Sequence, residues 1–180
     1  VFQPGQWCTY PWKSGYANVG VVRAVGAGVN RAKVGERVFT YGNHASMVVY
    51  PQDRLVIPVP ENMNSVTAAA SRMAGVATTA IVVSEIKDNP WVAVFGLGAV
   101  GNLAAQAYGI RGCRVIGVDP VASRRELAMR CGIEHTVGGS REEANQAIME
   151  LTKGQGADIT VDAVGHSAVV MQALPVSARS

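Results

Sequence analysis

Hydrophobic residues change their spacing along the chain near residue 64. Before that point, short runs rich in β-branched residues alternate with turn residues such as Pro4-Gly5 and Gly42-Asn43, a pattern typical of strands joined by turns. The expected strands span residues 19–25, 36–40, 46–50 and 54–57. We therefore predict a small β barrel or sandwich in residues 1–62.

From about Asn64 onward, the pattern becomes one of alternating helices and strands. Residues 65–84 are rich in alanine and apolar throughout, which predicts a largely buried helix. Apolar runs at 92–95, 115–118 and 158–162 predict strands between helices. Strand–helix repeats imply a parallel sheet, so we expect an α/β domain over residues 63–180.

Two serine–glutamate pairs mark the predicted starts of helices. Ser123 with Glu126, and Ser140 with Glu143, have the spacing of a capping box. We expect both pairs to open helices of the α/β region.

One strand passes into its helix through a glycine-rich turn. Gly96, Gly98 and Gly101 follow the apolar run 92–95 with the spacing G-x-G-x-x-G, and apolar residues then recur at helical spacing. This arrangement is the first unit of a dinucleotide-binding fold. Gly96 permits the tight turn, Gly98 lets the backbone approach a pyrophosphate, and Gly101 lets the helix pack against its strand. The expected pyrophosphate-binding segment is Gly96, Leu97, Gly98, Ala99, Val100 and Gly101.

An acidic residue stands where such a fold binds ribose. The second apolar run, 115–118, ends on Asp119, which lies 18 residues past Gly101. A carboxylate there accepts hydrogen bonds from the adenosine ribose and repels a 2′-phosphate, so NAD is favoured over NADP. The alternative is that Asp119 is a turn residue that leads the next helix before Pro120.

Composition narrows the class of protein. The chain has 180 residues, 48% apolar and 16% charged, below the usual charged share of about 25%, so we expect a substantial core. The net charge of +3 is not clustered, which argues against nucleic acid. Three widely spaced cysteines suggest reduced thiols in the cytoplasm. No apolar run approaches the roughly 18 residues of a membrane span, so we expect no membrane partner.

The order of these segments resembles the medium-chain dehydrogenase/reductase superfamily, which includes zinc alcohol dehydrogenases and quinone reductases. The matching stretches are 15–22, 25–29, 34–38, 96–101, 118–119 and 157–165. The resemblance implies that residues 1–62 are the C-terminal part of a GroES-like catalytic domain. It implies that residues 63–180 are a Rossmann domain with helices on both faces, incomplete at its C-terminal end. Relative to that family the chain looks truncated at both ends.

The resemblance also implies that the zinc ligands are missing. Zinc members carry a His-Glu pair where this chain has Tyr16-Ala17, and their later cysteine ligand falls on Gly75. Tyrosine and glycine lack the nitrogen and thiolate donors that zinc prefers. The histidines are too scattered to rebuild a site; they are His44, His135 and His166. We therefore expect no zinc.

Further site residues follow from the resemblance alone. Thr79 falls where a threonine borders the nicotinamide, and Arg124 where a basic residue faces the adenosine. Val164 and Gly165 fall on the loop beneath the nicotinamide ribose. The alternatives are that the Thr79 hydroxyl bonds back into its own helix and that Arg124 is a solvated helix residue.

The sequence does not identify a catalytic residue. Tyr16, at the lost histidine position, and His44, in a loop, are the two candidates for a hydrogen-bond donor at the substrate oxygen. The alternatives are a packed aromatic residue for Tyr16 and a surface-loop residue for His44. The cysteines are expected to be small core residues.

These observations favour an NAD(P)-dependent, zinc-independent oxidoreductase. It would transfer hydride between nicotinamide and a small alcohol, carbonyl or enone substrate. The open edge of the parallel sheet predicts self-association as a dimer. The rival interpretation is a non-catalytic or degenerate Rossmann-fold protein, kept for nucleotide binding or assembly, and a third is a glycine turn that no longer binds a cofactor.

Overall fold

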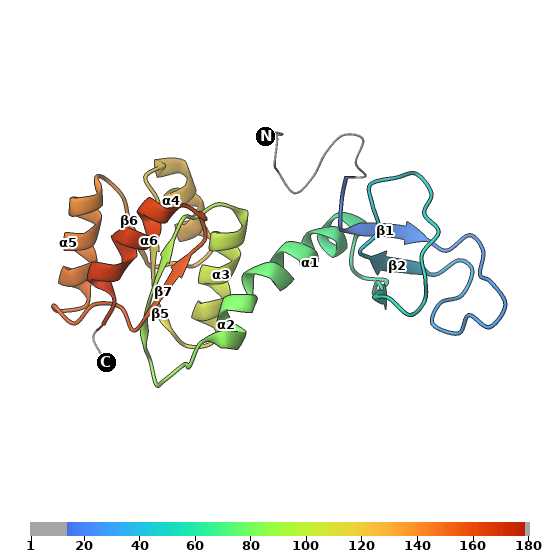
Figure 1. The fold of residues 1–180 in the computed structure, drawn as a ribbon, viewed down its shortest axis with the longest axis horizontal. Coiled ribbons are helices and arrows are strands. Elements are labelled where there is room, and N and C mark those ends of the chain that lie inside the picture. Colours follow the sequence, from blue (N-terminus) through green and yellow to red (C-terminus); the bar gives the residue numbers. More distant parts are fainter. Residues whose placement is uncertain (1–13, 179–180) are drawn as a thin grey trace. The chain divides into compact units, whose positions relative to one another are not determined.

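The computed structural model describes residues 14–178 of the chain. These residues form two compact units, of which one ends at Arg72 and the other begins at Met73. This boundary falls within helix α1 (Ser65–Ala77), which is labelled in Figure 1. The predicted domain boundary after residue 62 lies in the connection just before this helix.

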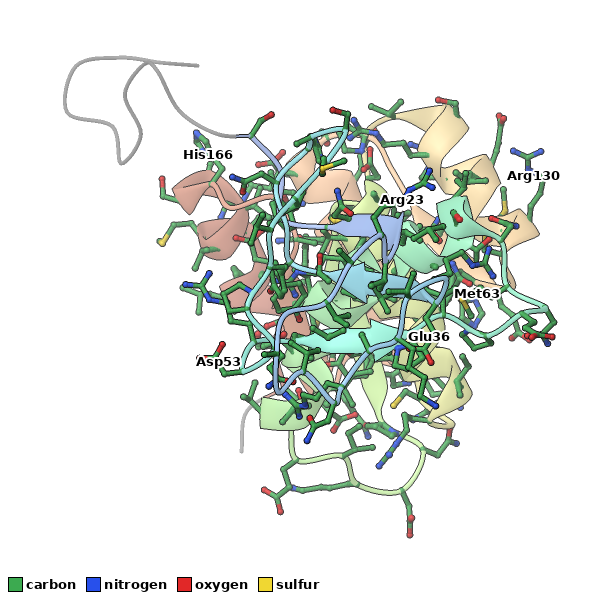
Figure 2. The ribbon with its side chains drawn as sticks, turned by 90° about the vertical axis from the view of Figure 1, so that its right-hand side faces the viewer. Arg23, Glu36, Asp53, Met63, Arg130 and His166 are labelled. Atoms are coloured by element: carbon green, nitrogen blue, oxygen red, sulfur yellow. The ribbon has the colours of Figure 1, made fainter. Side chains whose placement is uncertain are left out.

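The first unit contains a small antiparallel sheet. Its strands are β1 (Asn18–Val21), β2 (Arg37–Thr40) and β3 (Val56–Pro58), in the order β1-β2-β3 (Figure 2). The central strand β2 supplies the buried side chains of Val38 and Phe39. Three of the four predicted β segments therefore overlap a strand, and each strand is shorter than the predicted segment.

The fourth predicted segment, 46–50, forms no strand. Met47 is 76% exposed and Val49 98% exposed, and no strand pairs with this segment in the described part of the chain. The prediction was wrong because β-branched residues favour a strand only where a neighbouring strand packs against them.

The predicted helix 65–84 is two helices, and its predicted burial was wrong. Helix α1 is followed at once by α2 (Thr79–Val83), with Thr78 as the N-cap of α2. Val66 is 80% exposed and Val82 83% exposed, whereas Ala68 and Ala77 are buried. Apolar composition could not reveal that only a narrow face of these helices has packing partners among the described residues.

The same segment, Ser65–Val83, is long and apolar enough to cross a membrane, judged by length and composition alone. It escaped the sequence expectation because Arg72 and several hydroxyl residues interrupt the apolar run. This is weak evidence for a span, because core helices of soluble proteins pass the same test. The helix is also divided at Thr78.

The second unit is built on a parallel sheet, as predicted, and this sheet has four strands. The strands β4 (Trp91–Phe95), β5 (Arg114–Val118), β6 (His135–Val137) and β7 (Ile159–Asp162) lie in the order β6-β5-β4-β7. The chain winds outward from β4 through β5 to β6, and β7 then returns to the other side of β4. Open α/β sheets bind ligands at the carboxyl ends of strands at such a switch point.

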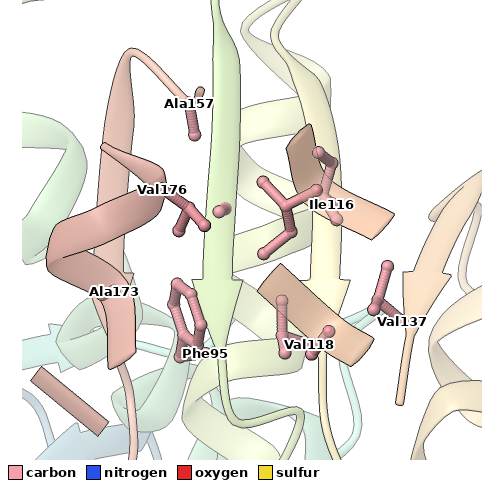
Figure 3. Packing of buried hydrophobic residues seen from close by; sticks show 10 residues of the cluster. Phe95, Ile116, Val118, Val137, Ala157, Ala173 and Val176 are labelled. Atoms are coloured by element: carbon pink, nitrogen blue, oxygen red, sulfur yellow. The ribbon is translucent and has the colours of Figure 1, made fainter. Parts of the chain in front are cut away.

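Helices follow each strand and cover both faces of this sheet. They are α3 (Ala99–Ile110), α4 (Ala122–Arg130), α5 (Arg141–Leu151), α6 (Ser167–Ala173) and the short 3₁₀ helix η1 (Leu174–Val176). Successive residues of a strand point to opposite faces. Val92 and Val94 of β4 therefore join one core with residues of α3, and Ala93 and Phe95 join the other with residues of α5 and α6. Figure 3 shows Phe95 beside Ala173 and Val176 in the second core.

One of the two predicted capping boxes forms. Ser140 and Glu143 make the reciprocal hydrogen bonds at the start of α5. The prediction of a Ser123–Glu126 box was wrong, because α4 begins at Ala122 and its N-cap, Val121, makes no side-chain hydrogen bond. The turn at Asp119 starts this helix early, since the Val121 amide donates to Asp119 Oδ1 at 2.8 Å.

Candidate dinucleotide-binding site

The glycine turn joins the carboxyl end of β4 to the N-terminus of α3. Gly98 is the N-cap of α3, and no side chain caps this helix. The first amides of a helix have no intrahelical acceptor, and the helix dipole places positive charge there. The turn therefore presents backbone donors of the kind that bind a phosphate group.

The three glycines of the turn meet different surroundings. Gly96 has φ +90°, and a Cβ there would lie 2.5 Å from Cγ2 of Val164. A Cβ on Gly101 would overlap the carbonyl oxygen of Gly96. A Cβ on Gly98 would meet nothing within 4 Å. Gly96 and Gly101 are thus required by the protein's own packing, whereas Gly98 faces open space, which fits a dinucleotide pyrophosphate.

Asp119 ties the end of β5 to this turn. Its side chain is 1% exposed, and Oδ2 accepts the Leu97 amide at 2.8 Å. Arg124 Nη1 lies 3.5 Å from the same oxygen, and the Arg124 side chain is 54% exposed. Arg125 Nη1 donates to the backbone oxygen of Asp119 at 2.7 Å. The carboxylate therefore lies beside the glycine turn, and its role at the ribose stays a prediction, as does that of Arg124.

The loop after β7 reaches the same turn. The Ala163 amide donates to Phe95 O at 2.9 Å, and Val164 packs against Gly96. The amides of Val164 and Gly165 donate to Asp162 Oδ1 at 2.8 and 3.2 Å. Loops following β4, β5 and β7 thus lie at the carboxyl end of the sheet. Together with the first turns of α3 and α4, they include every predicted cofactor residue except Thr79.

Three residues of this region were missed by the sequence reasoning. Asp162 at the end of β7 and Arg125 hold the loops just described. The sequence could have indicated Asp162 as an acidic residue at the carboxyl end of a predicted strand, and Arg125 as a member of the basic pair 124–125. Asn102 in α3 is 6% exposed, and its buried Nδ2 has no partner in the described part of the chain. Nothing in the sequence marks Asn102.

Thr79 is the first residue of α2 and belongs to none of these loops. Its hydroxyl donates to Gly75 O at 3.4 Å, which is the back-bond considered as the alternative. Its placement at the nicotinamide stays a prediction.

His44 packs against the residues that directly precede Tyr16 in the first unit. Gly15 has φ +94°, and a Cβ on it would overlap the imidazole of His44. The His44 amide donates to Ser14 O at 2.8 Å, and His44 is exposed. Tyr16 is 54% exposed. Their catalytic roles stay predictions.

The cysteines fall in different environments. Cys113 is buried in the core beside α3, and burial raises the pKa of its thiol. Burial also raises the pKa of Tyr108 in that core, although its hydrogen bond with Ser84 opposes the shift. Cys131 is exposed, so its placement in the core was wrong. Cys8 lies outside the described residues.

The donors at the matched positions do not fit zinc. Tyr16 and Gly75 stand where the resemblance places ligands, and neither supplies an imidazole nitrogen or a thiolate. Within residues 14–178, no group of three or more histidine, cysteine, aspartate or glutamate side chains is arranged to hold a metal.

Known proteins share both the sequence pattern and the fold. Residues 99–179 match the family described as zinc-binding dehydrogenase. An alcohol dehydrogenase of Geobacillus stearothermophilus is 30% identical over 189 residues, which cover 88% of this chain and 56% of that protein. The chain belongs to the medium-chain dehydrogenase/reductase superfamily. An erythritol/L-threitol dehydrogenase of Mycolicibacterium smegmatis is 32% identical over 136 residues, covering 75% of this chain and 38% of that enzyme.

Solved structures of this superfamily superimpose on the chain. A quinone oxidoreductase of Pseudomonas syringae pv. tomato gives a TM-score of 0.80 at 26% identity, covering 92% of this chain and 52% of that one. A mycobacterial protein complexed with NADPH gives a TM-score of 0.79 at 27% identity, and the match covers 94% of this chain and 56% of that one. The chain spans about half the length of these relatives or less. The matched family segment, 99–179, contains neither Tyr16 nor Gly75, so the family description does not bear on zinc in this chain.

Proposed function

We propose that this chain is part of an NAD(P)-dependent, zinc-independent oxidoreductase that acts on a small alcohol, carbonyl or enone. The observation that carries the proposal is the uncapped N-terminus of α3 behind Gly98, with open space where a Cβ would stand. Bound nicotinamide supplies the hydride chemistry. The residues of this chain bind and orient the dinucleotide.

Each loop at the edge of the sheet has a distinct task in this proposal. The first amides of α3 hold the pyrophosphate, and Asp119 accepts hydrogen bonds from the adenosine ribose hydroxyls. Its carboxylate opposes a 2′-phosphate, which supports a preference for NAD. Arg124 and Arg125 place positive charge beside it, so Asp119→Ser should shift the preference towards NADP.

Zinc independence rests on the chemistry of the matched positions. With tyrosine and glycine in place of ligands, hydrogen-bond donors must stabilise the charge that develops on the substrate oxygen. Tyr16 and His44 remain the candidate donors for that role.

The test is a turnover assay with NADH and NADPH against butanal, cyclohexenone and benzoquinone, with and without 1,10-phenanthroline. We expect NADH to be consumed with at least one carbonyl or enone, at a rate that the chelator leaves unchanged. Loss of activity with the chelator would contradict zinc independence. Nucleotide binding without any turnover would favour the rival function, a non-catalytic nucleotide-binding protein.

We also propose that the chain self-associates through the β7 edge of the parallel sheet. Just before β7 begins, Ala157 pairs with Ser177 in a single parallel bridge. The described residues show no strand along Ile159–Asp162 on the side away from β4. Light scattering after gel filtration should give a dimer mass, and a monodisperse monomer would contradict this.

The free thiols of Cys113 and Cys131 support a cytoplasmic location.

A further inference from the structure

Arg72 carries an unpaired positive charge in the first unit. Its Nε is buried with no hydrogen-bond partner in the described part of the chain. The one salt bridge among the described residues joins Arg124 to Asp119, so no carboxylate neutralises Arg72 there. A half-buried guanidinium without a counter-charge is costly, because charges lose hydration on burial.

Two tyrosine rings flank this guanidinium. The Arg72 Cζ lies 4.5 Å from the ring centroid of Tyr41 and 5.5 Å from that of Tyr16. The Tyr41 ring also packs edge-on against Phe39, with centroids 5.8 Å apart. These cation–π contacts attract the guanidinium to the two rings. They leave its hydrogen-bond donors unused, because an aromatic face accepts no directed N–H···O bond from them.

The site therefore combines a positive charge, two aromatic contacts and guanidinium donors that have no partner in the described part of the chain. A planar guanidinium pairs best with a carboxylate, through two parallel charge-assisted hydrogen bonds. Tyr16 is 54% exposed and Tyr41 44% exposed, so the flanking rings border solvent, where a small ligand can approach.

We propose that Arg72, held between Tyr16 and Tyr41, is a carboxylate-binding subsite that selects substrates carrying an acid group. The inference rests on the proposed function for its biological meaning, since the bound carboxylate belongs to the substrate of the oxidoreductase. The binding itself needs no cofactor. The subsite and the oxidoreductase activity can therefore fail independently.

The experiment is a ligand-observed NMR titration of the full chain with succinate as the probe. Butane-1,4-diol, of the same length without charge, is the matched control ligand. We expect saturable binding of succinate and none of the diol. Arg72→Gln should weaken succinate binding by about ten-fold or more, the loss typical of a charge-assisted pair.

Control variants separate the subsite from general charge and from folding. Arg23 is an exposed arginine of the same unit, labelled in Figure 2, and Arg23→Gln should bind succinate as the wild type does. Arg72→Lys keeps the charge but loses the planar donors, so it should bind between the wild type and Arg72→Gln. Tyr41→Leu should weaken binding while Arg72 remains. Circular dichroism of each variant shows whether it is folded.

Several outcomes would overturn the inference. Equal loss in Arg23→Gln and Arg72→Gln would mean that the effect is general charge. Absence of succinate binding, with Arg72→Gln lowering only the melting temperature, would make Arg72 a structural link between α1 and the small sheet. Inorganic phosphate competing as well as succinate would make the site an unselective oxyanion site. NADH titrated separately reports on the proposed function, so succinate binding without NADH binding would leave the subsite intact and remove its assignment to an oxidoreductase.

Discussion

The two units of the molecule differ sharply in how much they bury. In the unit from Met73 onward, strand residues such as Val92, Ala93, Val94 and Ile116 have no exposed surface, and the sheet has a core on each face. Among the described residues of the first unit, the buried apolar side chains are Val38, Phe39 and Ala68. Because burial of apolar area is the main stabilising contribution, we expect the second unit to carry most of the stability.

The difference also separates two kinds of candidate site. The cofactor loops project from a densely packed sheet, so their backbone amides are held in place before any ligand arrives. The aromatic and basic side chains of the first unit gather with little core behind them. Affinity for a nucleotide should therefore depend on backbone geometry, and selection of a substrate on individual side chains such as Arg72.

The largest expected effect comes from Gly101→Val. A Cβ at this position overlaps the Gly96 carbonyl oxygen, so α3 cannot pack against the turn. We expect the second unit to lose its cooperative thermal transition. Gly109→Ala is the matched control in the same helix, where a Cβ meets nothing within 4 Å. It should leave the transition in place or raise stability by about 0.5–1 kcal/mol.

The contrast in burial itself is tested by one truncation in each unit. Ile148→Ala removes a side chain with no exposed surface and should destabilise the second unit by about 2–5 kcal/mol. Phe39→Ala should instead raise hydrogen exchange in β1, β2 and β3 and leave the amides of β4 to β7 protected. If Phe39→Ala deprotected both sheets equally, the two units would be one cooperative structure, contrary to this account.

A smaller effect is expected at the start of α5. Ser140→Ala removes the side-chain acceptor that the Glu143 amide donates to at 3.2 Å, and the loss of such a cap costs about 1 kcal/mol. Urea unfolding measures it. Ser123→Ala is the matched control, because Ser123 lies inside α4 and caps nothing; a loss as large as that of Ser140→Ala would contradict the assignment.

The smallest effect is a pH dependence of the same cap. The hydrogen bond from the Ser140 amide holds the pKa of Glu143 below its ordinary value. The folded state therefore binds this proton less readily than the unfolded state, so the cap stabilises above the ordinary glutamate pKa. That contribution is lost as the pH falls through the lowered value. Glu143→Gln should remove this dependence in an NMR titration of the Ser140 amide; an unchanged titration would point to another group.

Motifs of a few neighbouring residues predicted most of the second unit, and the wrong predictions have physical causes. The glycine turn and Asp119 were predictable because each depends on a few adjacent residues and the end of one strand. Ser140–Glu143 and Ser123–Glu126 have the same spacing, yet only the first forms a box. At the Ser123–Glu126 pair, the Asp119 carboxylate accepts the Val121 amide, and α4 therefore begins before Ser123.

The features that the sequence did not predict depend on residues far apart in the chain. The exposure of Val66 and Val82, and the absence of a strand at 46–50, depend on which neighbours are present to pack against them. The grouping of Arg72 with Tyr16 and Tyr41 joins α1 to two loop residues, one just before β1 and one just after β2. A single sequence records no such pairing. The same holds for the catalytic roles of Tyr16 and His44, which remain predictions.

The most direct test of the central claim is a fluorescence titration of NADH with the wild type and with Gly98→Ala. A Cβ on Gly98 touches no atom of the protein within 4 Å, so the variant should keep the thermal stability of the wild type. The same Cβ occupies the space assigned to the pyrophosphate. We predict saturable binding to the wild type and binding weaker by about ten-fold or more to the variant. Equal affinity of the two proteins, or no binding to the wild type, would contradict the assignment of this turn as a cofactor site.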